Sequence, residues 1–398
     1  MEEFEKILND RVQEFMRLDS TRRDFHHGIV KNPFPDVPYV ELMGQIKSLL
    51  KAESKLPHLY RNHKIVYPAG VSIEQCSTLS TSRYKATLVS GERGADLTGG
   101  FGIDSMALSD VCKHLDYYEI NEDLARVVQH NFAVLEKANI TLHATDGLED
   151  IAANDKKYDF IYLDPARRDD KKDRVYRIED CSPNVLQWQD VLLESSRVVM
   201  TKLSPMVDIS LVSREMKSVK EIHVVALKGE VKEILVVQER GYEGGLDIFS
   251  VDIDGEDKVP FVYKKRTDVS VEIDTAVDYR YLYDVSAAMR KAGVADDYAA
   301  SMGLKKVGVG TFLYTSGERV EGFAGRVFEV VEEVNRKSVK KLLPSLKANV
   351  VTRNYPMRAD ELKRQLKIKD GSDDDFVIGF SSGEKKYHNI YCRRIKNS

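Results

Sequence analysis

The sequence predicts an α/β protein in which a doubly wound parallel sheet follows a helical region and precedes two small α+β units. Residues 85–270 alternate short apolar strands with amphipathic helices, and this alternation is typical of a parallel sheet covered by helices on both faces. Residues 1–84 instead repeat apolar side chains at helical spacing, with a proline-rich break at 31–39. The period changes again after residue 270, and we expect one small unit over 271–322 and another over 323–398.

Composition indicates a protein that folds in water and contains about two to four domains. Of its 398 residues, 42% are hydrophobic and 31% are charged, and no apolar run approaches the roughly 18 to 20 residues of a membrane span. The N-terminal stretch is acidic and amphipathic, so we do not expect a signal peptide. The four cysteines are widely spaced and form no CxxC pair. We therefore expect reduced thiols in a cytoplasmic protein, without a metal site or a disulfide framework.

Charge is distributed unevenly along the chain. The net charge is −4, but residues 336–369 contain eleven Lys or Arg and only two acids, Asp360 and Glu361, so this segment carries +9. The other 364 residues must then carry −13. A basic block in an acidic protein indicates a polyanionic partner that approaches one face, and a solvated charged surface is the alternative.

The stretch ADLTGGFGID, residues 95–104, follows one expected strand and opens an expected helix. Gly99, Gly100 and Gly102 allow the backbone to turn sharply and to approach a ligand closely. A dinucleotide site prefers the spacing GxGxxG, which places a pyrophosphate on helix amides. Here the strand ends in Asp96, and an acid suits a cationic ligand, such as the ammonium of an amino acid, better than a pyrophosphate. Ordinary turn glycines and solvated acids are the alternative interpretation.

Acids also follow the next three expected strands. Glu119 ends the second strand, where a carboxylate can accept both hydroxyl hydrogens of a ribose. Asp146 follows the third strand and can accept from an adenine amine, and Asp164 ends the fourth. Because the carboxyl ends of parallel strands meet at one edge of a sheet, we expect these acids to lie together.

This order of elements resembles the class I S-adenosylmethionine-dependent methyltransferases, which have a Rossmann-like sheet. The resemblance implies S-adenosylmethionine as the cofactor and a helix, upstream of the first strand, that closes over its methionine end. The candidates for this helix are Gln75, Ser80, Thr81, Tyr84 and Lys85, and plain helix capping and a solvated face are the alternative for all five. The cofactor-binding residues that we predict are Asp96, Thr98, Gly99, Gly100, Gly102, Asp104, Glu119, Ile120, Asp146, Gly147, Gln75, Thr81 and Lys85.

The stretch YLDPARRD, residues 162–169, is expected to hold the methyl acceptor. Amino-group methyltransferases have Asp or Asn, two prolines and an aromatic residue at this place, whereas this chain has Ala166 and Arg167 after its Asp-Pro pair. It is closer to the DPPR variants among RNA methyltransferases that act on ring atoms. We predict Asp164, Pro165 and Arg167 as catalytic residues. Asp164 would orient the acceptor or take its proton, and the guanidinium plane would stack on a base or bind a phosphate.

A covalent route through a cysteine thiolate is the less favoured mechanism. In the RNA enzymes that use it, the nucleophile lies near the end of the following strand, where this chain has Ser204. Cys181 is the only thiol nearby in sequence and is the alternative nucleophile. Direct SN2 transfer requires only that the acceptor be aligned with the methyl group and that water be excluded.

Most of the chain resembles a bacterial family of class I methyltransferases with a THUMP-like domain at the C-terminus. The motifs that carry this resemblance are EQCSTLSTSRYKA, DLTGGFGID, YLDPARRD, KLSPMVDIS, GEVKEIL and ANVVTRNYPMRADELKRQLKIKDG. In that family a ferredoxin-like unit and the THUMP-like unit follow the catalytic domain, which implies the same assignment for 271–322 and 323–398. THUMP domains bind RNA, so the resemblance implies tRNA or rRNA as the substrate. The RNA-binding residues that we predict are Lys347, Arg353, Tyr355, Arg358, Lys363, Arg364 and Lys367.

The favoured function is methylation of a base in structured RNA, without a metal ion and away from membranes. One alternative is an RNA-binding protein whose methyltransferase fold is not catalytic, although Asp96, Glu119 and Asp164 are all present. Another alternative is a small-molecule methyltransferase, which leaves the basic segment unexplained. A DNA amino-methyltransferase is disfavoured because no aromatic residue follows the Asp-Pro pair.

Overall fold

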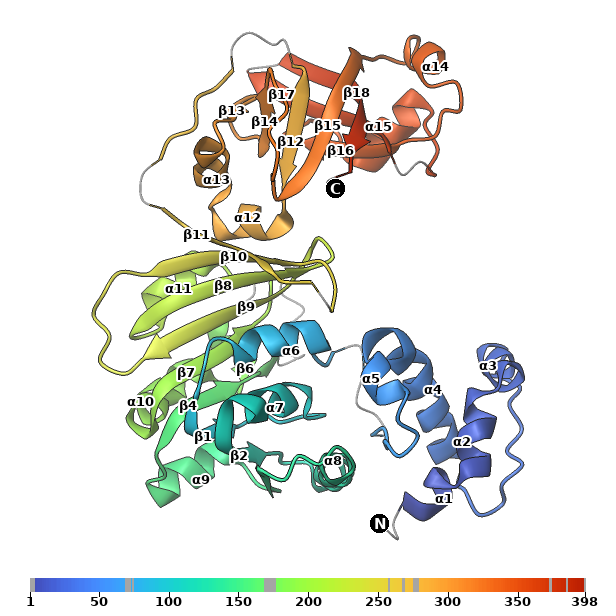
Figure 1. The fold of residues 1–398 in the computed structure, drawn as a ribbon, viewed down its shortest axis with the longest axis vertical. Helices are drawn as coiled ribbons and strands as arrows, with labels where there is room; N and C mark the ends of the chain where they lie inside the picture. The colour runs from blue at the N-terminus through green and yellow to red at the C-terminus, as the bar shows by residue number, and fades with distance from the viewer. Residues whose placement is uncertain are drawn as a thin grey trace. The chain divides into compact units, whose positions relative to one another are not determined.

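The fold is that of a computed structural model, which describes residues 4–68, 73, 75–167, 177–256, 258–266, 269–274, 279–371, 374–383 and 386–396 (Figure 1). The chain divides into two compact units. The first contains Met1–Ile222, Glu233–Leu246 and Gly255–Lys258, and the second contains His223–Lys232, Asp247–Asp254 and Val259–Ser398.

Five helices form the N-terminal region of the first unit. They are α1 (Glu5–Leu8), α2 (Asp10–Arg17), α3 (Asp19–His26), α4 (Tyr39–Lys55) and α5 (Pro57–Tyr60). Val12 and Met16, one helical turn apart on α2, are buried in the same cluster as Leu42, Ile46 and Leu49 of α4. The helical spacing that predicted this region therefore reflects one shared apolar core.

The large sheet has nine strands in the order β11-β10-β8-β9-β7-β4-β1-β2-β3. Strands β3, β2, β1, β4 and β7 are all parallel. Because the chain order reverses between β1 and β4, the carboxyl ends of these two strands border the crevice where open α/β sheets bind ligands. The strands are β1 (Gly91–Asp96), β2 (Cys112–Tyr118), β3 (Ile140–His143), β4 (Tyr158–Leu163), β7 (Ser196–Leu203), β8 (Val219–Leu227), β9 (Glu230–Glu239), β10 (Asp247–Ile253) and β11 (Phe261–Lys264).

Helices connect the parallel strands as the alternating pattern predicts. Figure 1 shows α6 beside α7, and these two helices pack against each other. A two-stranded ribbon of β5 (Ala166–Arg167) and β6 (Cys181–Ser182) follows β4. The connecting helices are α6 (Leu79–Ala86), α7 (Ile103–Leu108), η2 (Ser109–Val111), α8 (Glu122–Val134), α9 (Gly147–Asn154), η3 (Ile178–Asp180), α10 (Val185–Ser195) and α11 (Ile209–Glu215).

The sheet departs from the uniform parallel arrangement at β9, which runs antiparallel to β7. The expectation of a parallel strand there was wrong, because no helix separates β8 from β9. Only Lys228 and Gly229 connect them, and both have positive φ angles, 51° and 81°. Two such residues form the hairpin turn that matches the twist of adjacent antiparallel strands.

In the second unit, strands from 271–322 and 323–398 join in one seven-stranded sheet, of order β13-β14-β12-β15-β18-β17-β16. Only β16 and β17 are shown to be parallel there. The elements are β12 (Tyr281–Val285), α12 (Ala287–Ala292), α13 (Ala295–Ser301), β13 (Lys305–Lys306), β14 (Leu313–Ser316), β15 (Gly325–Glu333), α14 (Val339–Leu342), β16 (Asn349–Arg353), α15 (Ala359–Leu366), β17 (Asp375–Gly383) and β18 (Lys386–Ile395).

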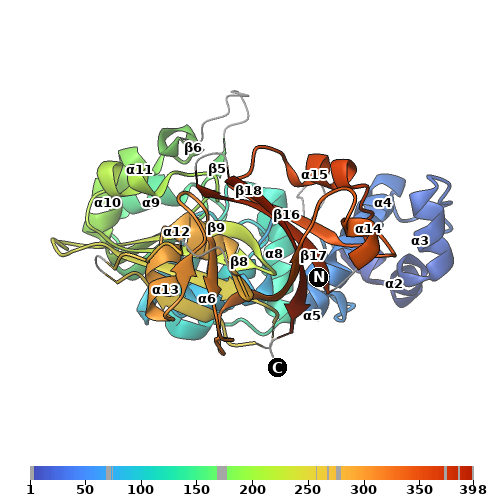
Figure 2. The ribbon, with the colours of Figure 1, turned by 90° about the horizontal axis from the view of Figure 1, so that it is seen from above.

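The two faces of this second sheet bury different clusters. Val377 and Tyr391 on one face pack against Leu362 and Leu366 of α15. Phe376, on the opposite face because side chains alternate along a strand, belongs to a separate cluster. Figures 1 and 2 both show α15 close to β16, which it contacts. Helix α15 therefore covers only one face of the sheet.

Candidate active site

The glycine loop between β1 and α7 has the backbone geometry that its residues predict. Gly100 and Gly102 have φ angles of 55° and 78°, a region that side chains other than glycine rarely occupy. At Gly99 a Cβ would lie 2.0 Å from the ring of Tyr117 on β2. The loop therefore requires glycine at Gly99 for close packing and at the other two positions for its turns.

Asp96 lies at the end of β1, and its buried side chain forms hydrogen bonds with the glycine loop and with α7. Its carboxylate accepts hydrogen bonds from the Thr98 amide, 3.1 Å away, and from the Ser105 hydroxyl, 2.5 Å away. Burial raises the pKa of Asp96 to about 7, although these two hydrogen bonds oppose the increase. A cationic ligand beside Asp96 would favour its charged form.

Glu119 and Asp146 follow the adjacent strands β2 and β3. The Glu119 carboxylate accepts from the amides of Gly100 (3.0 Å) and Asn121 (2.8 Å), so the glycine loop itself orients it. Asp146 caps α9 and accepts from the amide of Leu148, 2.9 Å away. Since each carboxylate oxygen has two acceptor positions, both acids keep capacity for a ligand.

These elements enclose a pocket of about 570 Å³, within the range of small-molecule sites. Ten of the thirteen residues predicted for the cofactor, and one predicted catalytic residue, line its walls. The predicted residues that line it are Gln75, Asp96, Thr98, Gly99, Gly100, Gly102, Asp104, Glu119, Ile120, Asp146 and Asp164. Side chains from the ends of β1, β2 and β4 and from the start of α9 thus meet at one place.

Asp164 is held at the edge of this pocket by two contacts. Its backbone amide donates to the Thr98 hydroxyl at 2.6 Å, which ties the end of β4 to the glycine loop. One of its carboxylate oxygens accepts from the Lys202 ammonium on β7 at 2.5 Å. Although burial favours a neutral amine, Asp164 and Glu233 raise the pKa of Lys202 above its ordinary value, so the amine stays cationic.

Of the other two predicted catalytic residues, Pro165 does not line the pocket. Pro165 is buried, two residues after the end of β4. Arg167 lies in β5 and pairs through its backbone with Cys181, but its side chain and all of Arg168 lie outside the described residues.

Lys85 corrects one part of the cofactor prediction. Its side chain is 0% exposed and is absent from the pocket wall. The ammonium instead donates to Ser77 at 2.9 Å and to Asp104 at 3.0 Å, and it pairs with Glu233 at 3.0 Å. These three partners use its three hydrogens, so Lys85 positions Asp104 rather than contacting a ligand.

Asp104 is the pocket residue on which this buried network converges. It also accepts from the hydroxyls of Ser77 (2.7 Å) and Tyr162 (2.9 Å). Burial alone would raise the pKa of Asp104, but the Lys85 and Lys202 cations hold it below its ordinary value. Asp104 is therefore a fixed anion in the wall of the pocket.

Four further predicted positions on helices also lie outside the pocket wall. Thr81 forms a capping box with Thr78 at the start of α6. Gly147 begins α9, and a Cβ there would lie 2.9 Å from Tyr118. Ser80 and Tyr84 are buried on α6, so the helix packs on the unit instead of presenting these side chains to the pocket.

Sequence reasoning missed several residues that line the pocket. Trp188, the single tryptophan of the chain, and Leu148 provide apolar walls, and Asn184 and Gln187 provide amides. The Asn184 side-chain oxygen accepts from the Leu186 amide at 3.1 Å and so caps α10. The capping pattern of SPNVLQW, residues 182–188, was the available signal, but it does not reveal which sheet edge the helix reaches.

Neither nearby cysteine has the environment of a nucleophile. Cys181 is buried and does not line the pocket. Cys76 does line it, but burial raises the pKa of its thiol, and the thiol donates to the Ile73 carbonyl at 3.0 Å. A thiolate mechanism gains no support from this geometry.

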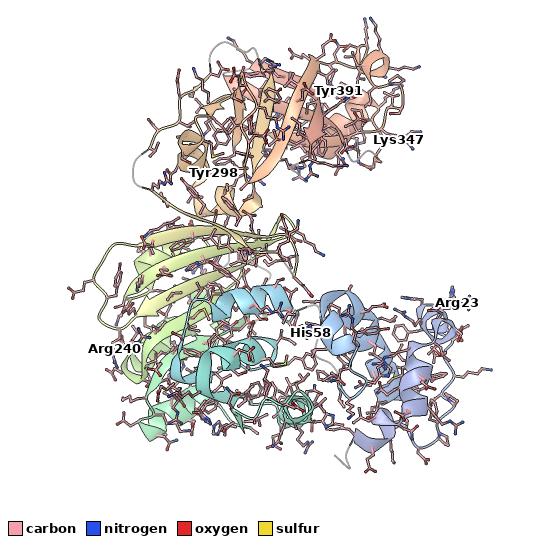
Figure 3. The ribbon with its side chains drawn as sticks, in the orientation of Figure 1. Arg23, His58, Arg240, Tyr298, Lys347 and Tyr391 are labelled. Atoms are coloured by element: carbon pink, nitrogen blue, oxygen red, sulfur yellow. The ribbon has the colours of Figure 1, made fainter. Side chains whose placement is uncertain are left out.

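The predicted RNA-binding residues in the second unit are dispersed. Arg353 binds the buried Asp284, at 2.8 and 2.9 Å, and Lys363 pairs with Asp370 at 2.9 Å. Lys347 is exposed at the margin of the unit (Figure 3). The expectation that these cations project from one face was wrong for Arg353, because it reaches the face opposite α15.

The remaining residues of that prediction lie on or beside α15. Arg358 caps the helix and Lys367 ends it, while the Arg364 side chain donates to the Asp360 carbonyl. Tyr355 packs edge-on against Tyr387. The acids of the segment thus share the helix surface with its cations, which reduces its positive potential.

The glycine loop, the acids at successive strand ends and the strand order together define the Rossmann-like class I methyltransferase fold. Residues 325–394 match the family model described as THUMP domain-like, so the C-terminal part of the chain contains a THUMP-like domain. The crystal structure of a "putative methyltransferase" from Porphyromonas gingivalis W83 has a TM-score of 0.81 and 28% identity, covering 97% of this chain and 98% of that one.

Other solved structures resemble part of the chain more weakly. An rRNA methylase from Streptococcus thermophilus has 12% identity and a TM-score of 0.31, covering 40% of this chain and 93% of its own. A "putative methyltransferase" from Streptococcus mutans, in complex with SAH, has 14% identity and a TM-score of 0.31, covering 40% and 96%. A search of curated proteins found no match.

The described residues were searched for membrane-spanning helices and for metal-binding groups of side chains, and they contain neither. None of the described helices is both long and apolar enough to cross a membrane. In the same part of the chain, His, Cys, Asp and Glu side chains form no group of three that could hold a metal ion.

Proposed function

We propose that this protein is an S-adenosylmethionine-dependent methyltransferase that methylates a base in structured RNA, either tRNA or rRNA. The observation that supports this most strongly is the joint placement of Asp96, Glu119 and Asp146 in one pocket with Asp164 at its edge. A methyltransferase fold and a THUMP-like domain in the same chain support RNA as the acceptor.

The pocket fits the cofactor by the chemistry of its walls. Glu119, oriented by the Gly100 amide, accepts the ribose hydroxyls, and Asp146 accepts from the adenine amine. Asp96 faces the ammonium of the methionine part, where its negative charge is favoured. Leu148 and Trp188 provide apolar surface for the adenine ring. At Gly99 and Gly102 an added Cβ would lie within 3 Å of the Tyr117 and Phe132 rings, so glycine lets the loop pack closely beside the pocket.

When bound, S-adenosylmethionine supplies an electrophilic methyl group. Asp164 orients the acceptor atom of the base, which is a nitrogen, an oxygen or a carbon, toward this methyl group. Asp164 then takes the proton that the acceptor loses. Lys202 fixes one carboxylate oxygen of Asp164, which leaves the other oxygen for the acceptor.

Binding measurements and nucleoside analysis test this proposal together. Isothermal titration calorimetry should detect S-adenosylmethionine but not NAD, and mass spectrometry should find one methylated nucleoside missing from the RNA of a deletion strain. Binding of NAD alone would refute the cofactor assignment. Cofactor binding without any change in RNA nucleosides would refute RNA as the acceptor.

A further inference from the structure

The second unit contains a basic pocket that lies apart from the predicted RNA-binding helix. Its volume is about 470 Å³, and it is lined by side chains of β15, β16, β17 and β18. We call it the Arg326 pocket. The residues that line it include Arg326, Asn349, Phe376, Arg394 and Lys396.

Strand register places these side chains on one face of the sheet. Phe328 pairs with Arg394, and Phe376 pairs with both Cys392 and Asn349. Because side chains alternate along each strand, Arg326, Arg394, Phe376 and Asn349 share a face. Val377 and Tyr391, which pack against α15, lie on the opposite face. The Arg326 pocket is therefore open on the side of the sheet that α15 does not cover.

A buried carboxylate beside this pocket is surrounded by three guanidinium groups. Asp284, only 2% exposed, accepts from Arg353 at 2.8 and 2.9 Å and from Arg326 at 3.1 Å, and it lies 3.4 Å from Arg290. Burial alone would raise the pKa of Asp284, but Arg353 and Arg326 hold it below its ordinary value. Three guanidinium groups thus surround this one carboxylate, and Asp252 also acts on Arg290.

The pocket adds further cations to this excess. Arg394 is exposed and makes no ion pair with the described residues, whereas Lys396 pairs with Asp374 at 3.1 Å at the surface. The exposed pair contributes little, because water screens it. Burial and the nearby Arg353 lower the pKa of Arg290, as expected where like charges crowd. An anion in the pocket would offset this repulsion.

The shape and chemistry of the pocket suit a phosphate that is part of a nucleotide chain. Guanidinium groups bind phosphate oxygens in pairs. Arg326 also lies over the rings of Phe328 and Phe376, 5.8 and 5.7 Å from their centres, so its plane is fixed. Phe376 and the adjacent valines of β16 give an apolar floor against which a ribose or base can rest.

We propose that the Arg326 pocket binds a phosphate group of the RNA chain and positions the RNA on the second unit. This proposal rests on the proposed function, because it takes RNA as the substrate. It assigns the contact to the open face of the sheet and not to α15. Asp284 sets the geometry of the guanidinium groups, while Arg394 and Lys396 contact the phosphate.

Neutralising the two exposed cations of the pocket tests this assignment. The variant Arg394→Gln/Lys396→Gln should raise the dissociation constant for tRNA and rRNA fragments about 10-fold or more. The slope of the logarithm of its binding constant against the logarithm of salt concentration should become shallower by about one for each lost phosphate contact. The matched control, Lys340→Gln/Lys341→Gln on α14, removes the same charge from the same unit and should change the dissociation constant little. Filter binding at several salt concentrations measures both.

The outcomes separate the pocket from the proposed function. Equal weakening by the two double variants, or none by the pocket variant, overturns the pocket assignment and leaves RNA as the substrate. A wild-type protein that binds S-adenosylmethionine but no RNA overturns both. Excess inorganic phosphate should compete with RNA for the wild type only weakly. If phosphate protects the wild type from thermal unfolding, but not the pocket variant, and RNA affinity is equal in both, the pocket binds free phosphate and the proposal fails.

Discussion

The two charged clusters of this molecule differ in the sign of their excess charge. Beside the glycine-loop pocket, the cations Lys85 and Lys202 face the carboxylates of Asp104, Asp164 and Glu233. In the second unit, the single carboxylate of Asp284 faces the guanidinium groups of Arg290, Arg326 and Arg353.

Buried charge is costly unless it is paired, so an excess of one sign beside an open pocket indicates the sign of the missing partner. The first cluster favours a cationic ligand, which agrees with the positively charged cofactor that we propose. The second cluster favours an anion, which agrees with phosphate. Specific substitutions can test this difference between the two clusters.

The largest effect is expected from removing the cation at the centre of the first cluster. Lys85→Met leaves Asp104 and Glu233 buried without their shared partner, so it should lower the free energy of unfolding by about 3 to 5 kcal/mol. Urea denaturation followed by circular dichroism measures this. Lys113→Met, which removes an exposed cation paired with Glu92, is the control and should leave the midpoint unchanged. A midpoint equal to that of the wild type for Lys85→Met would show that the network contributes no net stability.

A corresponding substitution in the second cluster should respond to anions. Asp284→Asn removes the charge that the three guanidinium groups share, and it should lower the melting temperature of the protein. Added phosphate should restore part of that loss, because an anion can replace the missing charge. The Lys85→Met variant should show no such recovery. Equal responses of the two variants to phosphate would remove the distinction between the clusters.

The next largest effect concerns methyl transfer. Asp164→Ala should leave cofactor affinity nearly unchanged but lower the single-turnover rate at least about 100-fold, the scale of a positioned acid-base group. Asp155→Ala removes an exposed carboxylate, paired with Lys157, and is the control. Rapid-quench measurements with labelled cofactor compare the two. A rate for Asp164→Ala equal to that of the control would exclude Asp164 from the chemistry.

A smaller effect is expected in cofactor binding. Glu119→Ala should weaken binding of S-adenosylmethionine by about 1 to 3 kcal/mol, because the ribose hydroxyls lose a charged acceptor. Glu122→Ala, an exposed acid in the first turn of α8, should bind normally. Calorimetry on both variants gives the difference. Unaltered affinity in Glu119→Ala would place the ribose elsewhere.

A pH dependence should also arise from Asp96. Because its folded-state pKa is raised to about 7, the stability of the ligand-free protein should fall as the pH rises from about 4 to 7, where only the folded state holds the proton. Cofactor affinity should rise over about pH 6 to 8 as Asp96 becomes charged beside the ammonium. Asp96→Asn should abolish both trends. Calorimetry that finds the same affinity at every pH in the wild type would contradict this role.

Much of the first unit could be predicted from local pattern. Strand and helix periods, together with the acids after β1, β2 and β4, identified the pocket because parallel strands bring their carboxyl ends together. Lys85 was misassigned for a physical reason. From the sequence alone, a lysine on a helix near a site is expected to contact the ligand. The structure shows instead that Lys85 is buried and pairs with Asp104 and Glu233.

The sequence by itself determined which residues carry the chemistry at the strand ends, because glycine geometry, helix caps and strand periods are local properties. The tertiary structure alone decided where the charges of distant segments meet. Glu233 reaches Lys85 across nearly 150 positions of the sequence, and Arg353 reaches Asp284 across nearly 70. Electrostatic interactions depend on distance and burial in space, so the cations that line the basic pocket, Arg326, Arg394 and Lys396, come from outside the basic segment of the sequence.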